Sequence, residues 1–323
     1  MACAFFTVSG PGVSLVPQSG KAIVTLLIGG SYIKQWSEVI GNSWWHYADK
    51  HGFDLIAIVG PLDDSDTARN RSVAWQKCLI LSQPWSHLYQ RIAWVDADIL
   101  INPYSPDIFR GVPDEKIGAV TTYQDSTISQ LHISHSRYHG FSGTGMVDPD
   151  QHLLEEVKRA FYDFYVRVHG LEQIDDQIAP GEENMISTGV LVLSPVVHKA
   201  ILEKAYYSFT ERTRMYEQTP LSYLVHKNCL LYEINSRFNW CIGSHLLRHW
   251  PELWLFLNNK HYDKIDIDLL EHIMHNEYIN SFFMHFATLI HLFNSIKTVS
   301  FPPQIGALSR AIKIDQVKFL GAI

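Results

Sequence analysis

Residues 91–103 read RIAWVDADILINP, an apolar run that contains two carboxylates separated by one small residue. An apolar run of this length predicts a buried strand. Side chains alternate along a strand, so an extended backbone would place Asp96 and Asp98 on the same side. Two carboxylates about 4 Å apart repel each other by roughly 4 kcal/mol at an effective dielectric constant near 20. A shared divalent cation would remove this repulsion, and carboxylates suit Mg²⁺ and Mn²⁺.

Two other interpretations of the carboxylate pair remain open. Asp is common in turns, so the pair could be solvated and cap the turn after a strand. A strand that ends in Asp-x-Asp also opens phosphatases of the haloacid dehalogenase family, in which the first Asp is the nucleophile. Those enzymes carry Thr or Val two residues after the second Asp, where this chain has Leu100, and they carry the motif near the N-terminus.

Residues 94–103 resemble the Asp-x-Asp segment of GT-A-fold glycosyltransferases, above all the glycogenin and lipopolysaccharide galactosyltransferase group and the yeast-type galactosyl/mannosyltransferases. The likeness extends over residues 21 to 290. It implies a Rossmann-like α/β fold, with a central mixed, mostly parallel sheet flanked by helices. It also implies that Asp96, Ala97 and Asp98 bind Mn²⁺ and the diphosphate of a sugar nucleotide.

Composition limits the class of protein and its partners. The 323 residues are 46% apolar and 18% charged, which is ordinary for a globular protein. A net charge of −7 argues against a broad nucleic-acid-binding surface. The four scattered cysteines favour a reduced compartment, although two disulfides remain open. No apolar run approaches 18 residues, so we expect no membrane span and a cytoplasmic location, with peripheral attachment to a membrane left open.

The first part of the chain alternates between strand and helix patterns. Residues 21–28 and 54–59 predict buried strands, and the apolar stripe between them predicts a helix, which together indicate a parallel α/β unit. Ligands bind beyond the carboxyl ends of such strands, which makes Ile28, Gly30 and Tyr32 candidate nucleotide contacts. A plain turn is the alternative. The Gly-x-Gly-x-x-Gly fingerprint of dinucleotide-binding proteins is absent.

Two further segments resemble donor-binding positions of the same enzymes. Residues 71–83 predict a helix, and Lys77 stands where the relatives keep a lysine that neutralises phosphate or holds the donor sugar; a solvated helix lysine is the alternative. The predicted strand at 186–195 resembles the strand that borders the donor sugar, through Ser187, Thr188 and Gly189. The relatives often have Asn at the position of Ser187, and a buried strand with a glycine bulge is the other interpretation.

Two candidates for the reaction centre lie farther along the chain. Glu217 and Gln218 stand where the relatives have an Asp-Gln pair beside the anomeric carbon, although Pro220 also fits an ordinary helix start. His285 ends a predicted strand at 282–286 and resembles the late His that completes the metal site with Asp96 and Asp98. The Gly and the Lys-Pro-Trp that usually follow are missing, because Ala287 and Thr288 follow and the next lysine is Lys297. A lone core histidine is the alternative.

The middle of the chain predicts a loop-rich insert and an amphipathic helix. The insert, residues 123–150, carries His132, His135 and His139, for which a flexible lid or acceptor loop is favoured over a zinc site. Residues 151–168 predict the helix.

The resemblance implies transfer of a sugar from a nucleoside-diphosphate sugar, most often a UDP-sugar, to a hydroxyl acceptor such as a glycan, with Mn²⁺ or Mg²⁺. Retention is implied by the resemblance alone. A non-catalytic sugar- or nucleotide-binding protein on the same fold is the alternative. We expect an N-terminal segment at 1–20, a transferase domain at 21–299 and a tail at 300–323. The nucleotide half of the domain would cover 21–122 and the acceptor half 123–299.

Overall fold

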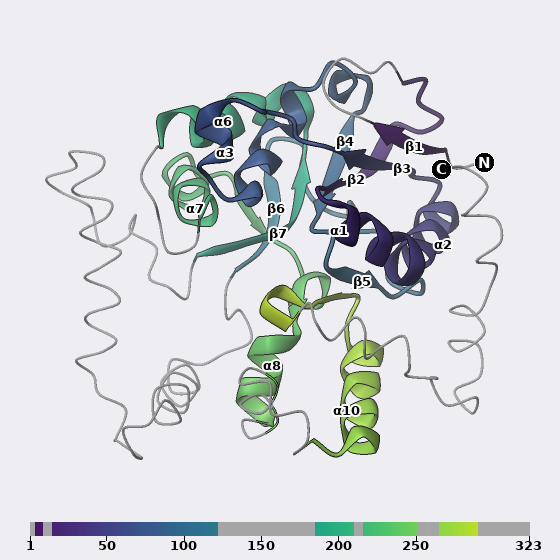
Figure 1. Cartoon of the computed structure of the whole chain (residues 1–323). Helices are drawn as coiled ribbons and strands as arrows, with labels where there is room; N and C mark the ends of the chain where they lie inside the picture. Colours follow the sequence, from purple (N-terminus) through teal and green to yellow (C-terminus); the bar gives the residue numbers. More distant parts are fainter. Residues whose placement is uncertain are drawn as a thin grey trace, which may run out of the picture.

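The computed structural model describes residues 4–8, 15–121, 185–209, 216–250, 253, 257 and 265–289. The expected insert at 123–150, with its three histidines, the expected helix at 151–168 and Lys297 lie outside the described residues. Within the described part, the architecture is a large mixed sheet covered by helices on both faces, with a small second sheet at one side (Figure 1).

The large sheet has seven strands in the order β1-β3-β2-β4-β7-β6-β8. Its strands are β1 (Phe5–Val8), β2 (Lys21–Leu27), β3 (Asp54–Val59), β4 (Arg91–Val95), β6 (Ile117–Thr121), β7 (Ile186–Leu193) and β8 (Leu231–Glu233). Only β7 pairs antiparallel to its neighbours, β4 and β6, whereas the other pairings are parallel. The predicted mixed, mostly parallel sheet is therefore confirmed.

The second sheet has three strands in the order β5-β10-β9. They are β5 (Ile99–Ile101), β9 (Trp240–Cys241) and β10 (Phe283–His285). Strand β10 runs antiparallel to β5 and parallel to β9. This sheet unites segments that are far apart in the sequence, and one of them directly follows the Asp-x-Asp motif.

Helices cover both faces of the large sheet. The α-helices are α1 (Gly30–Gln35), α2 (Gly41–His51), α3 (Asp66–Arg69), α6 (Pro195–Ser208), α7 (Gln218–Lys227), α8 (Ile242–His249) and α10 (Ile267–Asn280). A π-helical turn η1 (Trp36–Ile40) joins α1 to α2, and 3₁₀ segments are η2 (Val73–Ser82), η3 (Ser86–Leu88), η6 (Ser236–Asn239) and η8 (Ala287–Leu289). In Figure 1, α1 and α2 lie to one side of the sheet, α3, α6 and α7 to the other, and α8 and α10 below β5.

The alternation of side chains along the strands explains this double cover. In β2, Ile23 and Leu27 belong to the apolar core beneath α2, whereas Ala22, Val24 and Leu26 belong to the core beneath η2, α6 and α7. Because both faces of a strand are buried, a continuous apolar run is required rather than an alternating one. The apolar runs of the sequence meet this requirement.

Two features of the fold were not predicted from the sequence in the form that the structure has. Phe5–Val8, within the expected N-terminal segment, forms edge strand β1 beside β3. Residues 71–83 were expected to be helical, and Val73–Ser82 form η2, whose helix is of the 3₁₀ type. None of the described helices is long and apolar enough to cross a membrane.

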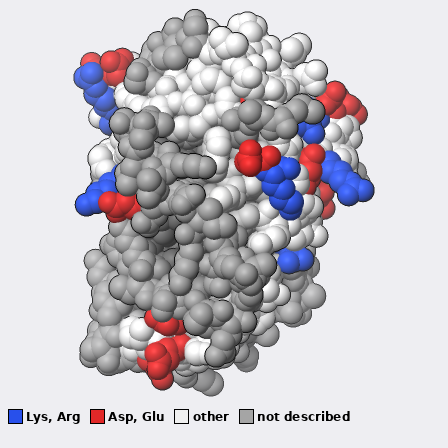
Figure 2. Space-filling model, turned by 90° about the vertical axis from the view of Figure 1, so that its right-hand side faces the viewer, with Lys and Arg blue, Asp and Glu red and all other residues white. Residues whose placement is uncertain are grey.

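On the face in Figure 2, the described Lys and Arg side chains lie among Asp and Glu side chains.

Candidate active site

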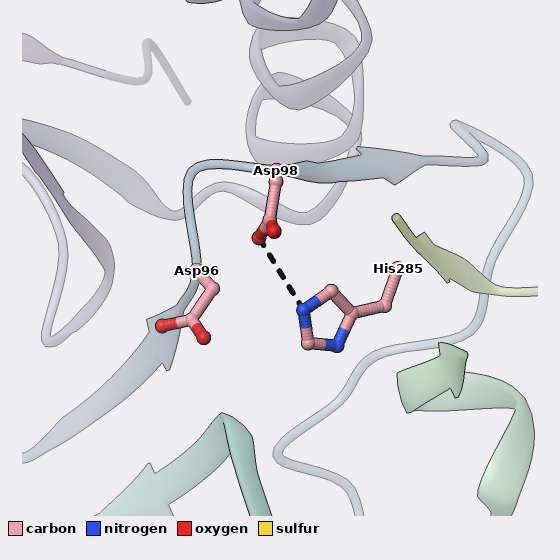
Figure 3. Close-up of side chains that lie close together, drawn as sticks. All are labelled: Asp96, Asp98 and His285. Atoms are coloured by element: carbon pink, nitrogen blue, oxygen red, sulfur yellow. Dashed lines mark ion pairs between the residues drawn. The ribbon is translucent and has the colours of Figure 1, made fainter. Parts of the chain in front are cut away.

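Three elements bring Asp96, Asp98 and His285 together (Figure 3). Asp96 directly follows β4, Asp98 directly precedes β5, and His285 ends β10, where it pairs with Ile99 of β5. One potential ligand atom from each side chain lies within 4.8 Å of the others. His285 Nε2 is 3.3 Å from Asp98 Oδ1. The structure thus unites the three side chains that the sequence proposed as metal ligands.

The carboxylates converge by a different route from the one expected. The backbone does not stay extended, since Ile99 N donates to Asp96 O across a turn at Ala97 and Asp98. An extended backbone through both carboxylates, the condition for their lying on the same side of one strand, is therefore not met. The chain leaves the large sheet after β4 and enters the small sheet at β5, and this change of sheet brings Asp98 beside His285.

Lys77 lies at the centre of a buried polar cluster. Its Nζ is 3.0 Å from Asp96 Oδ1, 2.9 Å from Glu217 Oε1 and 3.2 Å from the carbonyl oxygen of Thr188. The Lys77 side chain is 4% exposed, so the solvated helix lysine was the wrong alternative. Burial disfavours its charge, but the two carboxylates outweigh burial and raise the pKa of Lys77 above its ordinary value.

The Asp96 carboxylate is held from two sides. Trp94 Nε1 donates to Asp96 Oδ1 at 2.7 Å, and Lys77 contacts both carboxylate oxygens. Burial raises the pKa of Asp96, Lys77 opposes this effect, and the nearby Asp98 charge adds to it. The orientation of Asp96 is therefore set before any ligand binds.

The charges of the cluster do not balance. Three carboxylates, of Asp96, Asp98 and Glu217, face the single ammonium of Lys77, which leaves two negative charges when His285 is neutral. Burial alone would lower the pKa of His285, but Asp98 outweighs burial and raises it to about 9. A proton on His285 thus offsets part of the excess charge. Two carboxylates and an imidazole are a donor set that fits Mn²⁺, with Mg²⁺ preferring the oxygens.

The Glu217–Gln218 pair lies in the same cluster, at the start of α7. Glu217 Oε1 accepts from Lys77 and, at 2.8 Å, from Thr188 Oγ1. Gln218 Oε1 accepts from the backbone N–H of Thr188 at 3.3 Å. Glu217 Oε2 is buried and has no hydrogen-bond partner among the described residues. The pair is therefore connected to Asp96 through Lys77.

Strand β7 contributes Ser187, Thr188 and Gly189, and each has a contact inside the protein. Ser187 Oγ accepts from Asn239 Nδ2 at 2.8 Å, and the Thr188 hydroxyl donates to Glu217. The backbone carbonyl of Gly189 accepts from Asp96 N at 2.8 Å. A contact of these three residues with a donor sugar stays a prediction.

The predicted nucleotide contacts after β2 lie at the same edge of the sheet. Because β2 runs parallel to β4, Ile28 and Gly30 follow β2 on the side where Asp96 follows β4. Gly29 has φ +94°, which turns the chain into α1 at a position that favours glycine. Tyr32 lies in α1, and its side chain is outside the described part.

Two residues of the site were not among the sequence-based candidates. Trp94 holds Asp96, and Asn239 contacts both Ser187 and His285. The Phe238-Asn239 pair does resemble a segment of the glycosyltransferases named above. Only the fold shows what Asn239 touches, because its partners are 52 and 46 residues away in the sequence.

Comparisons with known proteins support the fold. No protein-family model and no curated protein matches the sequence. The structure is similar to that of the WbbM bifunctional glycosyltransferase, with a TM-score of 0.50 and 9% identity over 93% of this chain and 53% of that chain. This chain thus spans about half the length of WbbM.

Two further solved structures were found with lower scores. One is an active-site mutant of LgtC, with a TM-score of 0.42 and 11% identity over 86% of this chain and 95% of that chain. The other is mouse xyloside xylosyltransferase 1, with a TM-score of 0.41 and 10% identity over 82% of this chain and 97% of that chain. Together with the sheet order, the match to WbbM confirms the expected glycosyltransferase GT-A fold.

Proposed function

We propose that this protein is a metal-dependent glycosyltransferase that moves a sugar from a UDP-sugar to a hydroxyl acceptor, such as a glycan, with retention. The observation that carries the proposal is the convergence of Asp96, Asp98 and His285 beside the buried Lys77–Glu217 pair. This convergence lies at the carboxyl edge of a largely parallel sheet, where α/β proteins bind nucleotides.

The charge of the site supports a metal and a diphosphate that bind together. A cluster with excess negative charge repels a diphosphate in the absence of a cation. A divalent cation neutralises that excess and can bind carboxylates and phosphates at the same time. When bound, Mn²⁺ or Mg²⁺ would act as a Lewis acid on the leaving diphosphate and orient it.

We propose that Lys77 positions carboxylates rather than gripping phosphate. A lysine ammonium has three N–H donors, and Asp96, Glu217 and Thr188 account for three acceptors around it. Lys77 thereby connects the metal site to Glu217 and Gln218. By resemblance, these two residues would lie beside the anomeric carbon and stabilise its positive charge in the transition state.

The remaining expectations stay proposals. The transferase domain is proposed at 21–299, with its nucleotide half at 21–122 and its acceptor half at 123–299. The nucleotide is proposed to contact Ile28, Gly30, Tyr32 and Ala97, and the donor sugar to contact Ser187, Thr188 and Gly189. The proposed location is cytoplasmic. Neither the sugar nor the acceptor follows from the described residues.

A thermal-shift panel with the full chain tests donor binding. UDP and UDP-sugars with Mn²⁺ should raise the melting temperature, since a ligand that binds only the native state stabilises it by mass action. NAD with Mn²⁺ should not. A larger shift with NAD, or shifts that persist in excess EDTA, would contradict the proposal.

Release of UDP separates catalysis from simple binding. An enzyme should release UDP from one UDP-sugar, faster with a suitable glycan acceptor present. A non-catalytic binding protein on the same fold would show the thermal shift without release. The haloacid dehalogenase alternative would instead require phosphate release from simple phosphomonoesters.

A further inference from the structure

We propose that Asn239 is a positioning residue that fixes the orientation and tautomer of His285, so that Nε2 faces the metal. This inference rests on the proposed metal site. Asn239 ends η6 and is 5% exposed. Its Oδ1 lies 2.7 Å from His285 Nδ1, on the side of the ring opposite to Asp98.

The hydrogen bonds of Asn239 settle which way its amide points. Asn239 Nδ2 is 2.8 Å from Ser187 Oγ and 3.4 Å from the carbonyl oxygen of Ser187. A carbonyl oxygen only accepts, so the NH₂ group must face Ser187 and the amide oxygen must face His285. An amide oxygen also only accepts, so His285 Nδ1 carries a hydrogen and donates it. In the neutral ring, the lone pair is then on Nε2, the atom next to Asp98.

Gly189 confines the imidazole from another side. A Cβ at this position would lie 2.6 Å from His285 Cε1, 2.8 Å from Nδ1 and 3.2 Å from Asn239 Nδ2. The ring therefore occupies the space that a side chain would fill. With Gly189 from β7 and Asn239 from η6 around it, His285 has little freedom to rotate away from Asp96 and Asp98.

An amide is suited to this position because it carries no charge. The cluster of Asp96, Asp98 and Glu217 already holds more negative than positive charge. A carboxylate at 239 could accept the same hydrogen bond but would add a further negative charge. Groups that hold a ligating histidine through its second nitrogen are worth about 10- to 100-fold in metal affinity in other proteins.

Titration of the full chain with Mn²⁺ alone, without any donor, tests the inference by electron paramagnetic resonance of the free ion. Asn239→Leu should bind Mn²⁺ about 10- to 100-fold more weakly than the parent protein. Asn239→Asp should restore binding to within about threefold, because it restores the acceptor. Asn228→Leu is the matched control, since Asn228 donates to Leu224 O at the end of α7, and it should bind as the parent does.

Nitrogen NMR of histidine in the Mg²⁺-bound protein gives a readout that a purely structural role would not change. The parent should show an Nδ1–H of His285 with the downfield proton shift and slow solvent exchange of a hydrogen-bonded group, and Asn239→Leu should lose both signs of that hydrogen bond. If Asn239→Leu does not fold, as judged by circular dichroism, Asn239→Ala removes the same acceptor without inserting a branched side chain.

The outcomes separate this inference from the proposed function. If Asn239→Leu and Asn239→Ala bind Mn²⁺ like the parent while His285→Ala does not, the positioning role is wrong and the metal site stands. If weak binding is not rescued by Asn239→Asp, the positioning role is also wrong. If the parent protein itself does not bind Mn²⁺, both proposals are overturned.

Discussion

The imidazole of His285 lies so close to the backbone of Gly189 that a Cβ there would come within 2.6 Å of ring atom Cε1. Non-bonded atoms do not approach this closely, so Gly189→Ala must displace the ring. We expect Mn²⁺ affinity to fall by at least about tenfold, as for other losses of ligand orientation. Gly20→Ala is the control, since its Cβ would meet only the flexible end of Gln90. Equal Mn²⁺ affinity of Gly189→Ala and the parent would show that the ring is not confined there.

The second prediction concerns the carboxylate beside His285. Asp98→Asn keeps the shape of the side chain but removes its charge, so transfer should be abolished while the circular dichroism spectrum stays unchanged. Asp66→Asn alters a carboxylate that is 94% exposed and should leave activity at the parent level. Full transfer by Asp98→Asn, or by the parent in excess EDTA, would contradict a metal mechanism.

Lys77 offers a prediction about stability. Lys77→Met removes the ammonium that lies between the carboxylates of Asp96 and Glu217, and leaves the buried Glu217 carboxylate without its ion-pair partner. Breaking a buried ion pair in this way costs about 3–5 kcal/mol of unfolding free energy. Lys199→Met disrupts an exposed pair with Glu203 and should cost less than about 1 kcal/mol. Urea unfolding at neutral pH measures both; similar costs for the two variants would argue against a buried ion pair at Lys77.

The fourth prediction concerns Gln218. If Gln218 acts on the transition state more than on the donor, Gln218→Ala should lower kcat about a hundredfold, a loss of about 3 kcal/mol. The dissociation constant for the UDP-sugar should change far less. Steady-state kinetics with the true acceptor and a donor titration separate the two. Near-normal turnover, or weaker donor binding as the sole defect, would exclude Gln218 from the reaction centre.

The fifth prediction concerns the pH dependence of the unfolding free energy. It rests on His198, which is not part of the candidate site. Its Nδ1 accepts from Ser194 N at 2.9 Å, and burial lowers the pKa of His198 below 6.5 in the folded protein. Below the unfolded pKa, the unfolded chain binds a proton that the folded protein does not, so stability should fall as the pH falls through 6.5.

Denaturant unfolding at pH 7.5 and at pH 5.5 measures the effect. His198→Gln cannot take up the proton, so the difference between the two pH values should shrink. His272→Gln changes an exposed histidine and should show the same difference in unfolding free energy between the two pH values as the parent protein. If His198→Gln showed the same difference in unfolding free energy as the parent protein, His198 would not contribute to the pH dependence of stability.

Much of the fold follows from local pattern. The expected strands at 21–28, 54–59 and 186–195 correspond to β2, β3 and β7, because a strand buried on both faces requires a continuous apolar run. The resemblance to the glycosyltransferases, supported by the order of Asp96, Glu217 and His285 along the chain, proposed these residues as parts of one site. Edge strand β1 was missed, since Phe5–Val8 is a short run whose pairing with β3 is non-local.

The sequence by itself determined which side chains were available for a metal site, because the ligand chemistry of Asp and His follows from the identity of the residue. Only the tertiary structure decided how they meet. The turn at Ala97, the pairing of β10 with β5, the burial of Lys77 and the contact of Asn239 with His285 all depend on segments far apart in the chain. Alternation along one strand could not have produced them, since it describes neighbours within a segment and not the packing between segments.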